Sequence, residues 1–94
     1  MNIGDEVFVT SMYEIEGDYN NDYKIRKKAQ VLKIPGHIIE IDKNDTNSIR
    51  YQFGSAIHGG EIGFDCFLTK QEAENRVEGL NIYFKQNNCL IEEL

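Results

Sequence analysis

Few side chains in this sequence are suited to catalysis or metal binding. The only histidines are His37 and His58, and further reactive groups follow the second of them, namely Glu61, Asp65 and Cys66. A histidine beside a thiol can activate a nucleophile, and a histidine with carboxylates can bind a metal ion. The spacing matches neither kind of site. We therefore predict no catalytic, cofactor or metal site, with Cys66 as a buried thiol and both histidines exposed or held by structural contacts.

The segment 54–63, "GSAIHGGEIG", contains four of the eight glycines. It lacks the glycine and lysine spacing of phosphate-binding loops, and it contains no base that could meet an anion. We predict a mobile loop here, acting as a hinge or lid. A small ligand held beneath this loop is one possible use of it.

The segment 14–23, "EIEGDYNNDY", is acidic, contains two tyrosines and has no base. Acids that are crowded together repel one another unless positive charge lies against them, and exposed tyrosines often anchor protein interfaces. We predict that this segment binds the basic surface of a protein partner through Glu14, Glu16, Asp18, Tyr19, Asp22 and Tyr23.

A basic run follows directly, and with Lys33 it supplies half of the ten positive charges. Its members are Lys24, Arg26, Lys27 and Lys28. They could contact nucleic-acid phosphates while Tyr23 or Tyr51 stacks on bases. Alternatively, they could pair with the acids that precede them, and we favour this pairing.

Composition limits the remaining possibilities. The chain has 94 residues and a net charge of −6, which argues against unspecific binding to nucleic acid or anionic lipid. Two cysteines, Cys66 and Cys89, are too few for a disulfide framework, and we expect both to be buried thiols. No apolar run resembles a signal peptide or a transmembrane segment, so we expect a single domain over residues 1–94 in a bacterial cytoplasm, with no membrane partner.

Apolar residues that alternate with polar ones predict strands at 6–13, 25–34, 37–42 and 49–53, the last two forming a hairpin. Val7 and Val9 share one face of the first strand, and Ile39 and Ile41 share one face of the third. Thr69 and Glu72 form a capping box that predicts a helix over 70–86. The helix has one apolar stripe of Ala73, Val77, Leu80 and Phe84. Residues 87–94 fit either a strand or a further turn of helix.

Two stretches, "IGDEVFV" at 3–9 and "KAQVLKI" at 28–34, resemble the opening of SH3-like small barrels. The resemblance implies a mostly β (α+β) fold, an SH3-like barrel with one helix in its C-terminal half, in which the acidic segment is the long loop between the first two strands. The stretch "CFLTKQEAE" at 66–74 is similar to the end of small uncharacterised proteins of phages and mobile elements in low-GC bacteria. The chain lacks the tryptophan with which signalling SH3 domains bind proline-rich peptides.

These observations predict a non-enzymatic binding module, namely a phage or mobile-element inhibitor that occupies a basic surface of a host defence protein or enzyme. The alternatives are a nucleic-acid-binding accessory protein that uses the basic run, and a protein that sequesters a small ligand. Neither the identity of the partner nor the oligomeric state follows from the sequence.

Overall fold

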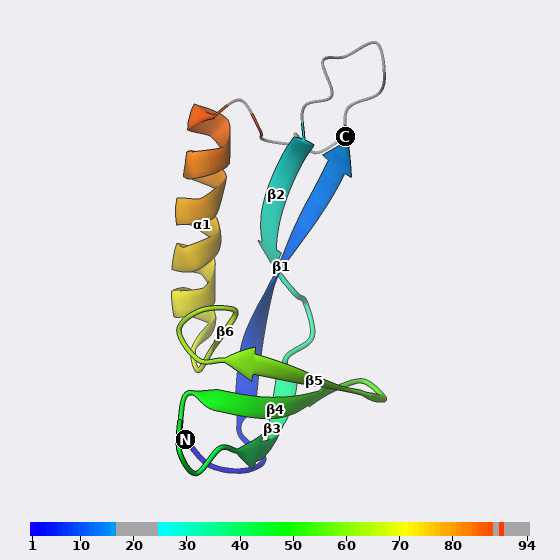
Figure 1. Cartoon of the computed structure of the whole chain (residues 1–94), viewed down its shortest axis with the longest axis vertical. Helices are drawn as coiled ribbons and strands as arrows, with labels where there is room; N and C mark the ends of the chain where they lie inside the picture. Colours follow the sequence, from blue (N-terminus) through cyan, green and yellow to red (C-terminus); the bar gives the residue numbers. More distant parts are fainter. Residues whose placement is uncertain (17–24, 88, 90–94) are drawn as a thin grey trace.

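The computed structural model describes residues 1–16, 25–87 and 89, and within them the chain forms a curled antiparallel sheet with one helix beside it (Figure 1). The strands are β1 (Glu6–Glu16), β2 (Ile25–Val31), β3 (Gly36–Ile41), β4 (Ser48–Phe53), β5 (Ala56–Glu61) and the short β6 (Cys66–Phe67), and the helix is α1 (Lys70–Gln86). The prediction of a mostly β, α+β chain with one C-terminal-half helix is confirmed, and its SH3-like identity stays a prediction.

β1 organises the sheet, because three strands pair with successive parts of it. Residues 6–7 pair with β3, residues 8–9 with β6 and residues 10–16 with β2, all antiparallel. The remaining strands follow as hairpins, which gives the order β2-β1-β3-β4-β5 with β6 at the side. β2 and β5 are therefore the two outer strands of this path.

The core lies where the N-terminal half of β1 meets β3, β4 and β6. Val7 and Val9 share one face of β1, as predicted, and this face is buried, where they pack with Ile38, Ile49 and Tyr51. Side chains of a strand alternate between its two faces, so this one buried face accounts for the alternating pattern of β1 and β4. The predicted hairpin of the third and fourth strands is confirmed.

The prediction that Ile39 and Ile41 share one face of the third strand was wrong. Ile38 is fully buried, whereas Ile39 is exposed and Ile41 is partly buried. The register of β3 against β4 shifts between Ile38 and Glu40, which is a β-bulge or irregularity that changes the direction of the next side chains. Gly36 opens this strand beside the Tyr51 ring, where an added Cβ would lie 2.7 Å from Tyr51 Cδ2.

The predicted loop over 54–63 was also wrong, because most of it is strand β5. Gly54, at a positive φ of 62°, and Ser55 make a two-residue turn that joins Phe53 to Ala56. β5 then pairs with β4 along its whole length, through Gly59 and Gly60 up to Glu61. The hinge or lid that we expected in this segment is therefore replaced by an ordered outer strand.

The helix begins and ends where the sequence predicts. The Thr69 hydroxyl accepts the Glu72 amide at 3.2 Å, and it donates to the Glu72 carboxylate at 2.8 Å. Ala73 and Phe84 are buried at the two ends of the apolar stripe. After the cap at Asn87, Cys89 is described without regular structure and is half-buried, so only Cys66 of the two cysteines is fully buried as expected.

The helix covers the outer edge of β2, and the figures show it running alongside that strand (Figure 1). The side-chain amide of Asn81 accepts from the Ala29 backbone amide at 2.8 Å and donates to the Ala29 carbonyl at 3.0 Å. Two residues along, the Lys27 amide donates to the Cys89 carbonyl. Backbone groups that would otherwise be open to another strand are thus satisfied from within the chain.

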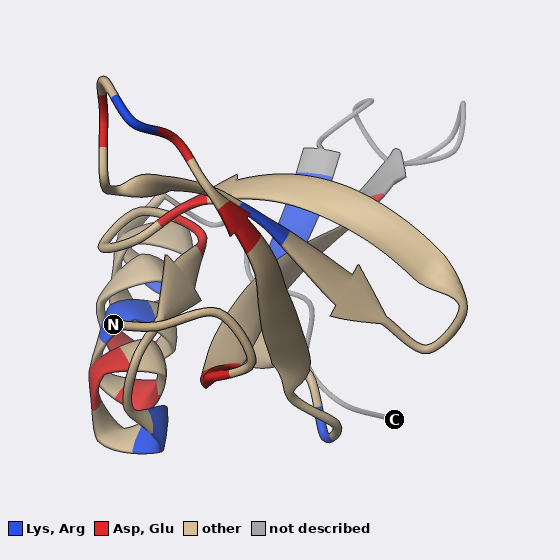
Figure 2. Ribbon diagram, turned by 90° about the horizontal axis from the view of Figure 1, so that it is seen from below, with Lys and Arg blue, Asp and Glu red and all other residues tan. Residues whose placement is uncertain are grey.

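Charged residues of both signs are exposed along α1 and at the β3–β4 connection (Figure 2). That connection carries Asp42, Lys43 and Asp45, and Asp42 Oδ1 accepts the Asn44 amide at 2.7 Å. No helix in the described part of the chain is long and apolar enough to cross a membrane.

Candidate functional site

Five of the predicted binding residues belong to a two-stranded ribbon, which we define as residues 10–16 of β1 and 25–31 of β2; they are Glu14, Glu16, Arg26, Lys27 and Lys28. The ribbon extends beyond the core, and its last pair is Glu16 with Ile25 (Figure 1). β1 is longer than the predicted strand 6–13, and β2 is shorter than the predicted 25–34, since it ends at Val31. Asp18, Tyr19, Asp22, Tyr23 and Lys24 lie outside the described residues.

One predicted acid is already paired within the ribbon. Glu14 lies opposite Lys27, and its Oε1 is 3.2 Å from Lys27 Nζ. We favoured pairing of the basic run with the preceding acids, and this ion pair is one instance of it. Both side chains are partly exposed, so the pair contributes at most about 1 kcal/mol to stability.

The basic run does not form one continuous surface. In the ribbon, Lys27 shares a face with Ala29, whose side chain is buried. Arg26 and Lys28 point to the opposite face, because neighbouring residues of a strand alternate. The alternation therefore divides the predicted nucleic-acid-binding residues between two sides of the ribbon.

The face that carries Arg26 and Lys28 also carries Tyr13, which sequence reasoning did not select. Tyr13 lies opposite Lys28, its side chain is 55% exposed, and its hydroxyl accepts from Gln30 Nε2 at 2.8 Å. Tyr13 is the last residue of the predicted first strand. Its polar and basic neighbours are on β2, so only the register of β1 against β2 identifies them. An exposed tyrosine held in place by a hydrogen bond is suited to anchor a partner.

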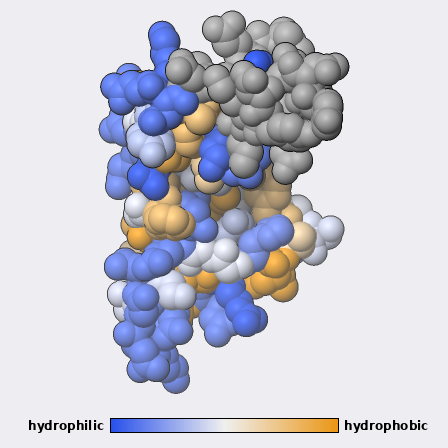
Figure 3. All heavy atoms as spheres, turned by 45° about the horizontal axis from the view of Figure 1, so that its top comes forward, coloured by the Kyte–Doolittle hydropathy of each residue, from blue (hydrophilic) through white to orange (hydrophobic). Residues whose placement is uncertain are grey.

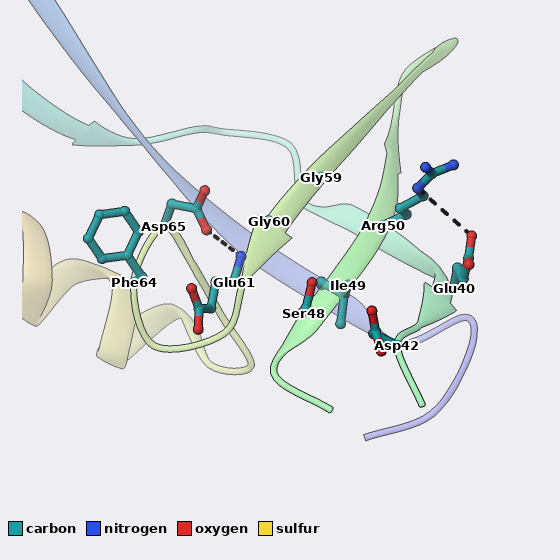
Figure 4. Close-up of a pocket in the computed structure, with 10 residues that line it drawn as sticks. All are labelled: Glu40, Asp42, Ser48, Ile49, Arg50, Gly59, Gly60, Glu61, Phe64 and Asp65. Atoms are coloured by element: carbon teal, nitrogen blue, oxygen red, sulfur yellow. Dashed lines mark hydrogen bonds and ion pairs between the residues drawn. The ribbon is translucent and has the colours of Figure 1, made fainter. Parts of the chain in front are cut away.

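A second feature lies at the other end of the molecule, on the sheet of β3, β4 and β5. It is an open hollow of about 600 Å³, which we call the acidic hollow (Figure 4). Its charged lining is Glu40, Asp42, Arg50, Glu61 and Asp65. Four of these five residues are acidic, and the Arg50 guanidinium is 3.9 Å from the Glu40 carboxylate. The hollow therefore favours a positively charged occupant.

Phe64 lies at one end of the acidic hollow and is 63% exposed. The guanidinium of Arg76, from α1, lies 5.7 Å from the centre of its ring. Within the described residues, no group of three or more histidine, cysteine, aspartate or glutamate side chains is arranged to hold a metal ion.

Cys66 is buried next to this hollow, and its thiol is not activated as a nucleophile. Burial raises the pKa of its thiol to about 12, and the Asp65 carboxylate adds to the shift. Burial also raises the pKa of Tyr51, with a smaller effect from the charge of Asp65. The thiol that could act as a nucleophile is thus kept protonated at neutral pH.

The two histidines stand on opposite faces of the sheet. His37 is paired with Gln52, and His58 is paired with Tyr51, whose ring is inside the core. Since Tyr51 and Gln52 are neighbours in β4, their partners point to opposite sides. The His58 ring lies 5.7 Å from the Tyr51 ring, and both histidines are exposed.

Comparison of the chain with protein-family models, with curated proteins and with solved structures finds no match.

Proposed function

We propose that the chain is a non-enzymatic binding module that occupies a basic surface of a protein partner through its ribbon. The observation that carries the proposal is the form of the ribbon. It extends past the core, has the helix along the edge of β2, and presents the exposed Tyr13 next to the start of the acidic segment.

The binding roles follow from the chemistry of the side chains. Glu14, Glu16, Asp18 and Asp22 speed the encounter with a basic partner, because opposite charges steer association. Tyr13, with Tyr19 and Tyr23, supplies apolar contact area that slows dissociation. The protonated thiol of Cys66 and the separation of the histidines support a role without catalysis.

The class of partner that we propose is a host defence protein or host enzyme with a basic channel. This part of the proposal rests on the resemblance of residues 66–74 to small phage and mobile-element proteins, and on the net charge of −6. The division of Arg26, Lys27 and Lys28 between two faces, with Lys27 paired to Glu14, makes protein a better partner for the ribbon than nucleic acid.

The test first identifies bound proteins by pull-down from a bacterial lysate with mass spectrometry, and then measures binding kinetics with the purified partner. Reversal of Glu16, Asp18 and Asp22 to lysine should slow association, and added salt should slow the wild type more than this variant. Tyr13→Ala should hasten dissociation. Tyr83→Ala is the matched control, because Tyr83 is 61% exposed but lies on α1.

Unchanged association of the triple reversal, or equal effects of the two tyrosine substitutions, would remove the ribbon from the interface. A gel shift with single-stranded and double-stranded nucleic acid at low salt tests the alternative hypothesis that the ribbon binds nucleic acid. Retention by nucleic acid that Arg26→Ala abolishes would assign the ribbon to that partner instead.

A further inference from the structure

The outer edge of β5 is a second feature that could receive a partner. Glu61 shows which way the backbone groups of this strand point. Its amide donates to Asp65 Oδ1 at 2.7 Å, and its carbonyl accepts the amides of Phe64 and Asp65 at 3.1 and 3.3 Å. The backbone groups of Glu61 therefore point away from β4.

Backbone groups alternate in direction along a strand, so those of Gly59 and Ile57 also point away from β4. In the described part of the chain, β5 pairs with β4 alone, and no hydrogen bond satisfies the outward groups of these two residues. Each of them presents one donor and one acceptor to an incoming strand.

The local sequence leaves this edge accessible. Gly59 has no side chain, and nothing lies within 4 Å of the place that its Cβ would occupy. Ile57 is 60% exposed, and Phe64 is exposed farther along. Neither a proline nor a lysine blocks the edge, although outer strands of natural proteins commonly carry such residues. In the view of Figure 3, apolar residues form small groups among polar ones.

The acidic hollow lies on one face of β3, β4 and β5, and its end at Glu61 and Asp65 adjoins this edge and favours a positively charged side chain there. Gly59 and Glu61 contribute to both the edge and the hollow, and Figure 4 shows Asp65 and Phe64 at one side of the strand with Asp42 and Glu40 at the other. A strand added to β5 would lie next to Glu61 and Asp65, whereas Glu40 and Asp42 lie beyond β4, so alternate side chains of the added strand could reach the first two carboxylates. Lysine or arginine at those positions would find opposite charge.

We propose that the edge of β5 binds an extended peptide segment that carries basic side chains, by adding it as a further strand of the sheet. Main-chain hydrogen bonds to Ile57 and Gly59 hold the segment, and the acidic hollow selects its charge. A second copy of this chain fits the edge less well, because two acidic hollows and two net charges of −6 would be brought together.

The test uses a capped synthetic peptide of alternating lysine and valine, titrated into the labelled full chain and followed by backbone NMR. The amide signals of Ile57 and Gly59 should shift on binding and exchange more slowly with solvent. A peptide of the same pattern with glutamate in place of lysine should not bind. Equal binding of both peptides, or no change at Ile57 and Gly59, would overturn the proposal.

Two substitutions at one position separate main-chain pairing from unspecific attraction. Gly59→Pro removes the outward amide and should weaken binding about tenfold or more, since an acceptor of the peptide loses its partner. Gly59→Ala retains the amide and has room for the methyl group, so it should bind nearly as the wild type does. Equal affinity of the two variants would contradict strand addition.

Glu61→Gln should weaken binding of the lysine peptide. It should leave the spectrum of the unbound protein essentially unchanged, because the backbone hydrogen bonds of Glu61 remain. Sedimentation of the unbound protein completes the test. A dimer whose formation shifts the Ile57 and Gly59 signals would assign the edge to a second copy and overturn the proposed occupant.

Discussion

The two outer strands of the sheet, β2 and β5, differ in whether their outward backbone groups have hydrogen-bond partners. Along β2, Asn81 and Cys89 satisfy the backbone groups of Ala29 and the amide of Lys27. Along β5, the groups of Ile57 and Gly59 have no partner among the described residues. The chain uses its single described helix to cover one edge and leaves the other available.

This difference shows which parts of the molecule serve stability and which are available for binding. Covering β2 prevents unwanted pairing at the edge of the ribbon and anchors the helix at the same time. At β5, an uncovered edge next to an acidic hollow is a risk of unspecific association unless a partner uses it. The edge of β5 is therefore a candidate binding surface in addition to the predicted acidic segment.

The largest expected effect is at the buried end of the helix stripe. Phe84→Ala should lower the free energy of unfolding by about 3 kcal/mol, because Phe84 is only 5% exposed and its loss leaves a cavity. The neighbouring Tyr83→Ala should change stability little, since that ring is mostly exposed. Urea denaturation measures both, and equal losses would mean that the helix does not cover β2 through Phe84.

Asn81 tests the covered edge itself. Asn81→Ala should cost about 2 kcal/mol, because both backbone groups of Ala29 lose a partly buried partner. Asn81→Asp retains an acceptor for the amide but places an oxygen against the Ala29 carbonyl, so it should not restore stability. Asn75→Ala, at an exposed site of the same helix, is the control. A denaturation midpoint that Asn81→Ala leaves unmoved would show that the edge is held by other contacts.

A smaller effect is expected where the helix begins. Thr69→Ala removes the side-chain bond to the Glu72 amide and should cost about 1 kcal/mol. Thr69→Ser retains the hydroxyl and should recover most of the loss in the same denaturation experiment. If alanine and serine behave alike, the helix start does not depend on this cap.

The sequence predicts the helix well because its signals are local. Thr69 and Glu72 stand three residues apart, and the stripe from Ala73 to Phe84 repeats at helical spacing. Asn81 gave no comparable signal, since its partner Ala29 lies 52 residues away in the chain. The role of a polar residue at a helix face follows from tertiary contacts that no local pattern contains.

β5 could not be recognised from its composition. Gly59 and Gly60 are poor strand formers, and pairing with β4 overrides this weak preference. The one local sign was the two-residue connection of Gly54 and Ser55, which is typical of a tight hairpin. In β3, adjacent isoleucines at 38 and 39 both suit a buried position, and the register shift decided between them.

The candidate site was predicted in part. The pairing of Glu14 with Lys27 follows from acids and bases that adjoin in sequence, whereas the exposure of Tyr13 beside Lys28 depends on the register of two strands. The acidic hollow combines Glu40 and Asp42 with Glu61 and Asp65 from distant segments. Only the folded sheet brings those carboxylates to one place.

Amide hydrogen exchange, measured residue by residue in the unbound protein, tests the difference between the two edges most directly. The account predicts slow exchange at Lys27 and Ala29, whose amides are bonded, and fast exchange at Ile57 and Gly59, whose amides point to solvent. Slow exchange at Ile57 and Gly59, equal to that at Ala29, would show that the edge of β5 is already covered and would contradict the account.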